Sequence, residues 1–423
     1  MKIAICTNIP DKNSPMLLSY FNYCTSDGHK AYIIGKKDIY NKVYEGSIFT
    51  TNYLQYKLHY LLVPFVAIFL IFWTIGLFFN LKKRKPLPLS TTIKDFASAT
   101  KYFANTLYLN LFHFITLLRI KPDFVVCVCA GSTIAARGYQ FFTNTPFSYN
   151  MYEIYPNQLA TNSIISKHLK ATIESKACKK ASTIFIPFSN QYKRLLCLRY
   201  KLNTSTKFVQ ICSIPKDIEP PTLPTESKSY VSIYYHGSYD KQRGLETLVY
   251  AIKNFSANKV KLYLRGFGSE EAFLKQIVQQ ESLSHQIVFL EPLPPDQLAS
   301  AAAGYDVGIT MIKNETANNR FLIGFKAIDF IAAGIVLIVP DGYVLKDLVE
   351  KYKVGIHYDT LTVESLTRTI KKIVDNPAAF QNYKENSKKL ANDVINFNAQ
   401  KKIFLQTIDT EIKENRYFNT ITY

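Results

Sequence analysis

The chain has 423 residues, which is enough for two domains of ordinary size. Its hydrophobic fraction of 48% and charged fraction of 20% exclude a mainly disordered protein, and 16 glycines with 18 prolines exclude collagen-like and low-complexity chains. The formal net charge of +19 predicts an anionic partner: a nucleic acid, a lipid headgroup or a phosphorylated small molecule. A solvated basic surface would carry the same charge.

The first half of the chain predicts a parallel sheet with one long helix. Short apolar runs typical of buried strands are Ile3–Cys6, Ala31–Ile34, Phe124–Cys129, Phe147–Tyr149 and Thr183–Ile186. Before the third of these runs, apolar residues recur at three- and four-residue steps, which indicates one face of a helix. They are Phe96, Ala99, Phe103, Leu107, Leu111, Phe114 and Leu118.

Residues 60–79 form an uncharged apolar stretch (YLLVPFVAIFLIFWTIGLFF), and a basic run at 82–85 follows it. The length suits a membrane span, and the basic run is typical of a cytoplasmic flank. A true span would place strands of one sheet on opposite sides of the membrane, and Pro64 and Gly76 disfavour a straight helix. We therefore expect an insertion at about 58–86 that dips into one leaflet or lies on it. A buried core helix is the alternative.

A linker and a second alternation of strands and helices follow. Residues 215–229 (PKDIEPPTLPTESKS) are rich in proline, serine and charge, which indicates a linker. Predicted strands are Tyr230–Tyr235, Lys261–Leu264, Ile287–Leu290, Val307–Met311, Val336–Val339 and Val354–His357. Predicted helices between them are Leu245–Phe255, Ser269–Gln280 and Asp296–Ala303.

This alternation predicts an α/β protein with two doubly wound, Rossmann-like domains that face each other across a cleft. The expected boundaries are 1–214 for the first domain and 230–395 for the second. A helix and tail at 396–423 could return to the first domain.

The cysteines and histidines show no metal pattern. No two of the seven cysteines have CxxC spacing, and the seven histidines form neither HExxH nor a Cys/His cluster. Buried thiols in a reducing compartment are the simplest interpretation. The chain begins directly with a strand-like run, so no signal peptide is expected.

The first motif is His236–Glu246 (HGSYDKQRGLE), which follows a strand and opens a helix. Gly237 allows a tight turn, and Arg243 with Gly244 places a guanidinium beside the helix N-terminus. Such a turn suits a diphosphate, which needs bidentate donors. An ordinary strand–helix turn with a surface arginine is the alternative.

Two further motifs follow. Leu264–Gly268 (LRGFG) again places glycines at a strand end, which close strand–helix packing explains equally well. In Asn318–Gly334, a helix from about Phe325 would put Lys326 and Asp329 on one face. The carboxylate could accept ribose hydroxyls and the ammonium could meet a phosphate, whereas a surface ion pair is the alternative.

In this order the motifs resemble the second domain of family 4 glycosyltransferases of the GT-B fold, closest to bacterial polysaccharide enzymes. The resemblance covers 230–400. The first domain matches more loosely, through MKIAICTN at the start, Asp27–His29, Lys121–Asp123 and Tyr149–Pro156. Five positions of this chain depart from the family pattern. Tyr152 stands where relatives have a histidine, Ser238 where many have an arginine, and Arg243 where they have the phosphate-binding lysine. Phe321 and Asp329 stand at the positions of the first and second acids of the family's paired-acid motif.

The resemblance implies retaining transfer of a hexose from a nucleotide sugar, with no metal or other cofactor. It implies donor binding by Gly237, Ser238, Arg243, Gly244, Arg265, Gly266, Asn319, Arg320, Lys326 and Asp329. The resemblance also implies that the first domain is on the acceptor side and that its Glu153 is the catalytic residue, which positions the sugar or the acceptor. A solvated loop carboxylate is the alternative for Glu153.

The sequence thus favours a glycosyltransferase of surface-polysaccharide biosynthesis, bound to an anionic membrane surface on its cytoplasmic face through residues 60–85. The acceptor would be a saccharide, most simply a lipid-linked one. The rival hypothesis is a non-catalytic scaffold or regulatory subunit of a polysaccharide assembly complex. Nucleic-acid binding is not expected, because no basic stripe with interleaved aromatics exists outside the run at 82–85.

Overall fold

The structure is a computed structural model. It describes residues 1–7, 15–36, 48–51, 89–151, 164–214, 229–313, 317–321 and 323–421. The insertion expected at about 58–86 and nearly all of the expected linker lie outside these residues.

The chain forms two compact units. The first unit comprises Met1–Pro187, Lys193–Gln210 and Phe404–Tyr423, and the second comprises Phe188–Tyr192 and Ile211–Ile403. Two short pieces expected in the first domain, Phe188–Tyr192 and residues 211–214, belong to the second unit. The helix and tail expected at 396–423 are divided at Ile403, and the part after it belongs to the first unit.

The first unit contains a parallel sheet in the order β3-β2-β1-β4-β5-β6-β7. Its strands are β1 (Lys2–Cys6), β2 (Lys30–Lys36), β3 (Ile48–Thr51), β4 (Phe124–Cys127), β5 (Phe147–Asn150), β6 (Thr183–Ile186) and β7 (Phe208–Gln210). All five predicted strands are present. β4 ends two residues earlier than predicted, because Cys129 has φ 136° and its backbone cannot continue the strand.

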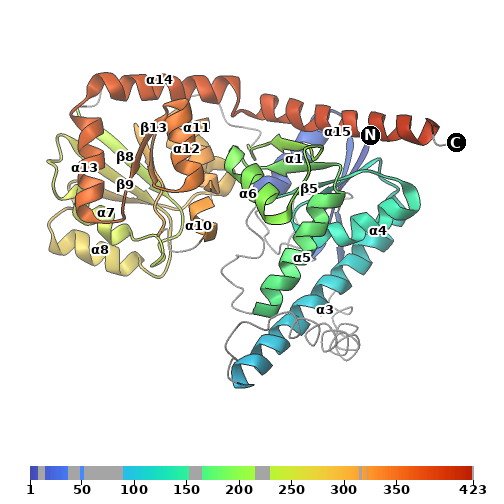
Figure 1. Ribbon diagram of the computed structural model, residues 1–423. Helices are drawn as coiled ribbons and strands as arrows, with labels where there is room; N and C mark the ends of the chain where they lie inside the picture. Colours follow the sequence, from blue (N-terminus) through green and yellow to red (C-terminus); the bar gives the residue numbers. More distant parts are fainter. Residues whose placement is uncertain are drawn as a thin grey trace. The chain divides into compact units, whose positions relative to one another are not determined.

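Helices cover both faces of this sheet (Figure 1). They are α1 (Pro15–Thr25), α3 (Leu89–Ile120), the short 3-10 helix η3 (Ala130–Ser132), α4 (Thr133–Thr143), α5 (Ile164–Lys180) and the later parts of α6 (Asn190–Tyr200) and α15 (Phe397–Ile421). Side chains of α3 and α4 pack with alternate residues of β1 and β4, such as Cys6 and Val125. On the opposite face, Tyr20 of α1 stacks on Phe404 of α15 with ring centroids 4.7 Å apart.

The last helix therefore returns to the first unit. Beyond Phe404, the Glu411 carboxylate accepts hydrogen bonds from the Thr183 hydroxyl at 2.8 Å and the Lys207 ammonium at 3.1 Å. These contacts tie α15 to β6 and to the segment before β7. A C-terminal helix that could return to the first domain was expected from the sequence, and this is what the structure shows.

Helix α3 leaves part of its predicted apolar stripe exposed. Leu107, Leu111 and Leu118 of this stripe are between 39% and 49% exposed, and so is the neighbouring Ile115. The buried face instead carries polar residues such as Asn110, whose amide donates to the Gly131 carbonyl and accepts from the Ala135 N–H, both at 2.8 Å. The periodicity predicted the helix correctly, but not which side chains face its neighbours, because a satisfied amide can replace an apolar contact.

The second unit contains a six-stranded parallel sheet in the order β10-β9-β8-β11-β12-β13. The strands are β8 (Val231–His236), β9 (Val260–Arg265), β10 (Ile287–Leu290), β11 (Val307–Ile309), β12 (Val336–Pro340) and β13 (Gly355–Tyr358). All six were predicted, to within two residues at each end. Two doubly wound parallel sheets, as expected from the sequence, are thus confirmed.

Two separate cores lie on the two faces of this sheet. α7 (Leu245–Ile252), α8 (Glu271–Gln280) and α13 (Val363–Val374) share one core with Ile233 and Tyr235 of β8. α9 (Leu298–Ala302), α11 (Gly324–Ala332), α12 (Tyr343–Tyr352) and α14 (Pro377–Asp393) share the other with Tyr234. Alternate residues of β8 thus face opposite sides, as a strand buried on both faces requires.

All seven cysteines are free thiols, and only Cys197 is not fully buried. Across the described helices, none combines the length and apolar character that crossing a membrane requires. The apolar stretch at 60–79 is not among them.

Candidate functional site

The candidate site lies at the carboxyl end of β8, in the middle of the second sheet. The strand order runs from β8 through β9 to β10 on one side and through β11 to β13 on the other. The chain therefore reverses its winding direction beside β8. Ligands of doubly wound folds bind at such a switch point, at the carboxyl ends of the strands.

Gly237 follows β8 immediately and lies against Lys326 of α11. Its φ is 128°, a conformation that favours glycine. A Cβ at this position would lie 2.6 Å from the Lys326 ammonium nitrogen, so any side chain would displace the lysine. The ammonium also donates to the Tyr235 hydroxyl at 3.0 Å and lies 4.6 Å from the centroid of that ring. The glycine thus allows Lys326 to lie across the turn.

Lys326 shares this place with a second cation. Burial first, and then the nearby Arg243 guanidinium, lower the pKa of Lys326 to about 7, while the carboxylates of Asp240 and Asp329 oppose this shift. Two cations from different elements are therefore held near one turn. Such an arrangement favours an anion between them.

The turn from Ser238 to Arg243 is fixed by its own side chains. The Ser238 hydroxyl donates to Asp240 at 2.6 Å, and the Arg243 Nε donates to the Ser238 hydroxyl at 3.3 Å. Gly244 then precedes α7 with φ 64°, and a Cβ there would lie 2.6 Å from the Leu361 side chain. The structure thus brings Gly237, Ser238, Arg243 and Gly244 into one turn at the α7 N-terminus. Asp240, which orients Ser238 and Arg243, was not singled out from the sequence.

Arg265 and Gly266 are placed differently. The Arg265 guanidinium donates to the Tyr234 hydroxyl at 2.9 Å and also to the Glu291 carbonyl. Tyr234 itself stacks on Tyr305, with ring centroids 4.4 Å apart. A Cβ on Gly266 would overlap the Gly237 carbonyl oxygen. Gly266 therefore allows the β9 turn to pack against the β8 turn, and the contacts of Arg265 are those of a residue that holds strand ends together.

Asn319 and Arg320 lie on the short helix α10 (Ala317–Phe321). The buried Asn319 amide donates to the Lys313 carbonyl at 2.7 Å, while Arg320 is exposed. The Lys313 N–H in turn donates to the Gln242 carbonyl at 3.1 Å. Asn319 thus connects to the β8 turn through the backbone.

Asp329 lies one helical turn after Lys326 on α11 and is buried. Its Oδ2 is 3.5 Å from Nε2 of His236, the last residue of β8. Burial raises the pKa of Asp329 well above its usual range, which Lys326 opposes, and burial lowers the pKa of His236 to about 3. The exposed ion pair that the spacing also allowed is therefore not what the structure contains. His236 was not predicted as a site residue, although it is the first letter of the first motif.

Two other expectations stay predictions. Glu153 lies outside the described residues. Among the residues that the structure describes, no three His, Cys, Asp or Glu side chains are grouped so that they could hold a metal ion, and the expectation of a reaction without a cofactor stays a prediction.

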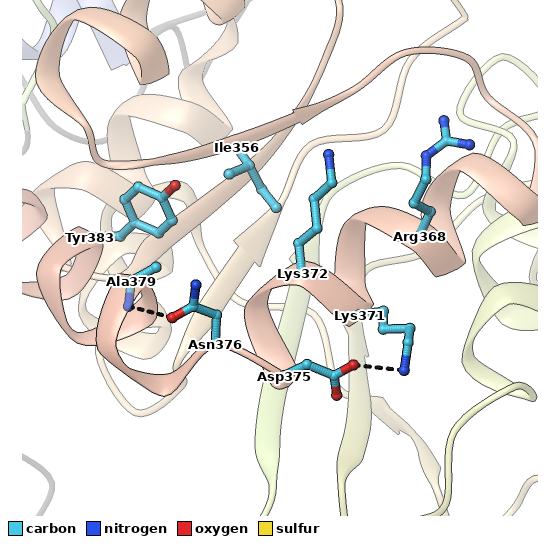
Figure 2. A pocket seen from close by; sticks show the side chains of 8 residues that line it. All are labelled: Ile356, Arg368, Lys371, Lys372, Asp375, Asn376, Ala379 and Tyr383. Carbon is cyan, nitrogen blue, oxygen red and sulfur yellow. Dashed lines mark hydrogen bonds and ion pairs between the residues drawn. The ribbon is translucent and has the colours of Figure 1, made fainter.

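A surface cavity of about 490 Å³ lies between α13 and α14 and is drawn in Figure 2. Its lining includes Arg368, Lys371 and Lys372, but none of the site residues predicted from the sequence. Lys371 is already paired with Asp375 at 2.6 Å, and Arg368 with Asp359 at 2.9 Å. Two of its three cations are therefore neutralised by the protein itself.

Residues 216–390 match the family model described as "Glycosyl transferases group 1". The match identifies a glycosyltransferase. It covers the β8 turn and all of α11, so the predicted donor residues of the second unit lie within it. The expectation of a glycosyltransferase is confirmed, while membership of family 4 stays a prediction. Comparison with curated proteins gives no match.

Solved structures similar to this chain show the fold. Sucrose-phosphate synthase from Thermosynechococcus elongatus has a TM-score of 0.67 at 14% identity, covering 97% of this chain and 98% of its own. Anabaena Alr3699/HepE in complex with UDP has a TM-score of 0.66 at 12% identity, with coverages of 97% and 100%. A mutant of S. aureus TarM, in complex with fondaparinux, alpha-GlcNAc-glycerol and UDP, has a TM-score of 0.61 at 9% identity, with coverages of 96% and 99%. The expected GT-B fold is confirmed.

Proposed function

We propose that the protein is a retaining glycosyltransferase that moves a hexose from a nucleoside-diphosphate sugar to a lipid-linked saccharide in surface-polysaccharide biosynthesis. The observation that carries the proposal is the convergence of Lys326 and Arg243 on the Gly237 turn, at the carboxyl end of β8. The turn belongs to the part of the chain that matches glycosyltransferases.

The diphosphate would bind between these two cations. Burial and, after it, the nearby Arg243 guanidinium lower the pKa of Lys326, so part of this shift comes from repulsion between two like charges. A diphosphate would relieve this repulsion and would also meet the N-terminal N–H groups of α7. The buried Asp329 carboxylate, one turn further along α11, would accept hydrogen bonds from the ribose hydroxyls.

The same groups would assist the reaction. As the bond between the sugar carbon and the phosphate oxygen breaks, negative charge develops on the diphosphate, and fixed cations stabilise it without a metal. The acceptor hydroxyl would attack the sugar carbon from the same face as the departing diphosphate. The proton of this hydroxyl would pass to the departing phosphate oxygen. In this proposal Glu153 positions the sugar or the acceptor.

The choice of nucleotide for a first test comes from the similar structures. Complexes of HepE and TarM contain UDP, and one HepE structure contains UDP-glucose. UDP should raise the melting temperature of this protein, and transfer or slow hydrolysis of a UDP-sugar should follow. If neither UDP, ADP, GDP nor CDP stabilised the protein at millimolar concentration, the proposal would fail.

We also propose association with the cytoplasmic face of the membrane. Support comes from the apolar stretch at 60–79, the basic run at 82–85 and the exposed stripe of α3. On α4, Phe141 and Phe142 extend this surface, being 82% and 70% exposed, and Phe142 contacts Phe114 of α3. Exposed apolar area of this kind is typical of a lipid or protein contact. Sedimentation with anionic vesicles tests it.

A non-catalytic scaffold is the second candidate, and Phe321 is the observation that favours it. This residue stands at the position of the family's first acid, and its ring packs 5.0 Å from Tyr343 and 6.2 Å from Tyr192. An apolar packing residue there leaves the donor sugar without that carboxylate. Purified protein that binds UDP but neither transfers nor hydrolyses any UDP-sugar would support the scaffold.

A further inference from the structure

His236 is a buried polar side chain with no hydrogen-bond partner at Nε2. The side chain is 2% exposed, and the Nε2 atom finds no partner among the described residues. The ring packs edge-to-face on Phe330 at 4.9 Å and lies 5.7 Å from Tyr234. An aromatic residue without nitrogen would fill this place equally well, and burying an imidazole nitrogen without a partner is costly. Packing alone therefore does not explain a histidine here.

The polar atom that Nε2 faces belongs to Asp329. The two atoms are 3.5 Å apart, longer than an ordinary hydrogen bond but within reach of one after a small shift. Because burial lowers its pKa to about 3, His236 is neutral at pH 7 and has one ring proton. With that proton on Nε2, the ring would donate to Oδ2 of Asp329. Oδ1 would remain to accept from a ligand.

We propose that His236 is a positioning residue that orients the Asp329 carboxylate toward the ribose hydroxyls of the donor. The inference rests on the proposed function, since it assumes that a nucleotide binds at the Gly237 turn. Contacts that tighten only when a ligand arrives are common in ligand-free sites. His236, at the end of β8, and Asp329, on α11, would thus act as one unit in recognising ribose.

The experiment compares ribose with a sugar that lacks both hydroxyls. Calorimetry measures the affinities of UDP, ADP, GDP and CDP, each beside its 2′,3′-dideoxy counterpart. For the nucleotide that binds, the wild-type protein should favour the ribose form by about tenfold or more, as expected for hydrogen bonds to a carboxylate. The His236→Phe variant keeps the ring packing but removes the donor. It should bind both forms with nearly equal affinity, while its affinity for the dideoxy form stays at the wild-type value.

Two further variants separate positioning from folding. The amide of His236→Gln can donate from a position close to Nε2, so this variant should recover part of the preference for ribose. His285→Gln, at an exposed position of the same unit, serves as the matched control and should keep the full preference. Combining His236→Phe with Asp329→Asn should reduce the preference no further than Asp329→Asn alone, because both act on the same hydroxyls.

The contradicting results are distinct. A His236→Phe or His236→Gln protein that folds and loses affinity equally for both forms would show a structural role and overturn the inference. Wild-type preference in His236→Phe would do the same. A wild-type protein that binds a nucleotide but ignores the hydroxyls would overturn the inference and leave the proposed function standing. Failure to bind any of the four nucleotides would overturn the proposed function itself.

Discussion

The ammonium of Lys326 gives the site a measurable dependence on pH. Its pKa is about 7 because of burial and the Arg243 guanidinium, so at pH 8 and above most of the free protein has a neutral Lys326. A diphosphate binds more tightly to the protonated form. Binding therefore raises the pKa of this lysine, takes up a proton, and weakens as the pH rises.

The magnitude follows from the protonated fraction. Between pH 8 and pH 9 this fraction falls about tenfold, so the affinity for UDP should fall by about the same factor, or about 1.4 kcal/mol. UDP is fully ionised over this range. Of the groups near Lys326, Tyr235 has its pKa raised by burial and His236 has its pKa lowered, so neither titrates between these values.

Calorimetry of UDP binding at pH 8 and 9, in buffers with different ionisation enthalpies, measures both the affinity and the proton uptake. Wild-type protein should take up nearly one proton per UDP. In the Lys326→Arg variant the guanidinium stays charged at both pH values. The UDP affinity that this variant retains should therefore be the same at pH 8 and pH 9. Two results would refute the assignment of Lys326 to the diphosphate site. One is a wild-type UDP affinity that is constant from pH 8 to 9, and the other is a Lys326→Arg variant whose affinity falls with pH as steeply as that of the wild type.

Three further predictions concern other parts of the molecule. Arg243→Ala should weaken UDP binding by about tenfold or more, measured by calorimetry, whereas Arg265→Ala should mainly lower the melting temperature because it loses the Tyr234 and Glu291 contacts. Gly237→Ala should displace the lysine of α11 and reduce UDP affinity; unchanged affinity would show that the lysine is not in the site. Leu111→Glu should weaken sedimentation with anionic vesicles without changing the melting temperature. Phe273→Glu changes a similarly exposed residue of the second unit, and an equal loss of sedimentation in this control would show that the α3 surface is not the membrane contact.

Much of the fold could be predicted because the strands are buried on both faces. Runs such as Ile3–Cys6 and Val336–Val339 are continuously apolar, and parallel strands with helices between them have few alternative arrangements. The strands at Ile48–Thr51 and Phe208–Gln210 were missed, since each is three or four residues long at a sheet edge. Propensity carries little information at that length.

The site was predictable only in outline. Motif spacing placed Gly237, Arg243, Lys326 and Asp329, which the structure brings to the end of β8. The spacing could not show that Arg265 binds Tyr234, because that depends on which way a strand-end side chain turns. The contact between His236 and Asp329 joins residues 93 positions apart, and such a pair becomes visible only once the helix is packed on the sheet.

The most direct test of the account is the position of UDP in a crystal structure of the complex. The account predicts the diphosphate at the Gly237 turn, with its oxygens contacted by Lys326 and Arg243 and its ribose hydroxyls on Asp329. UDP bound elsewhere on the second unit, or bound at this turn with both cations turned away from the phosphates, would contradict it.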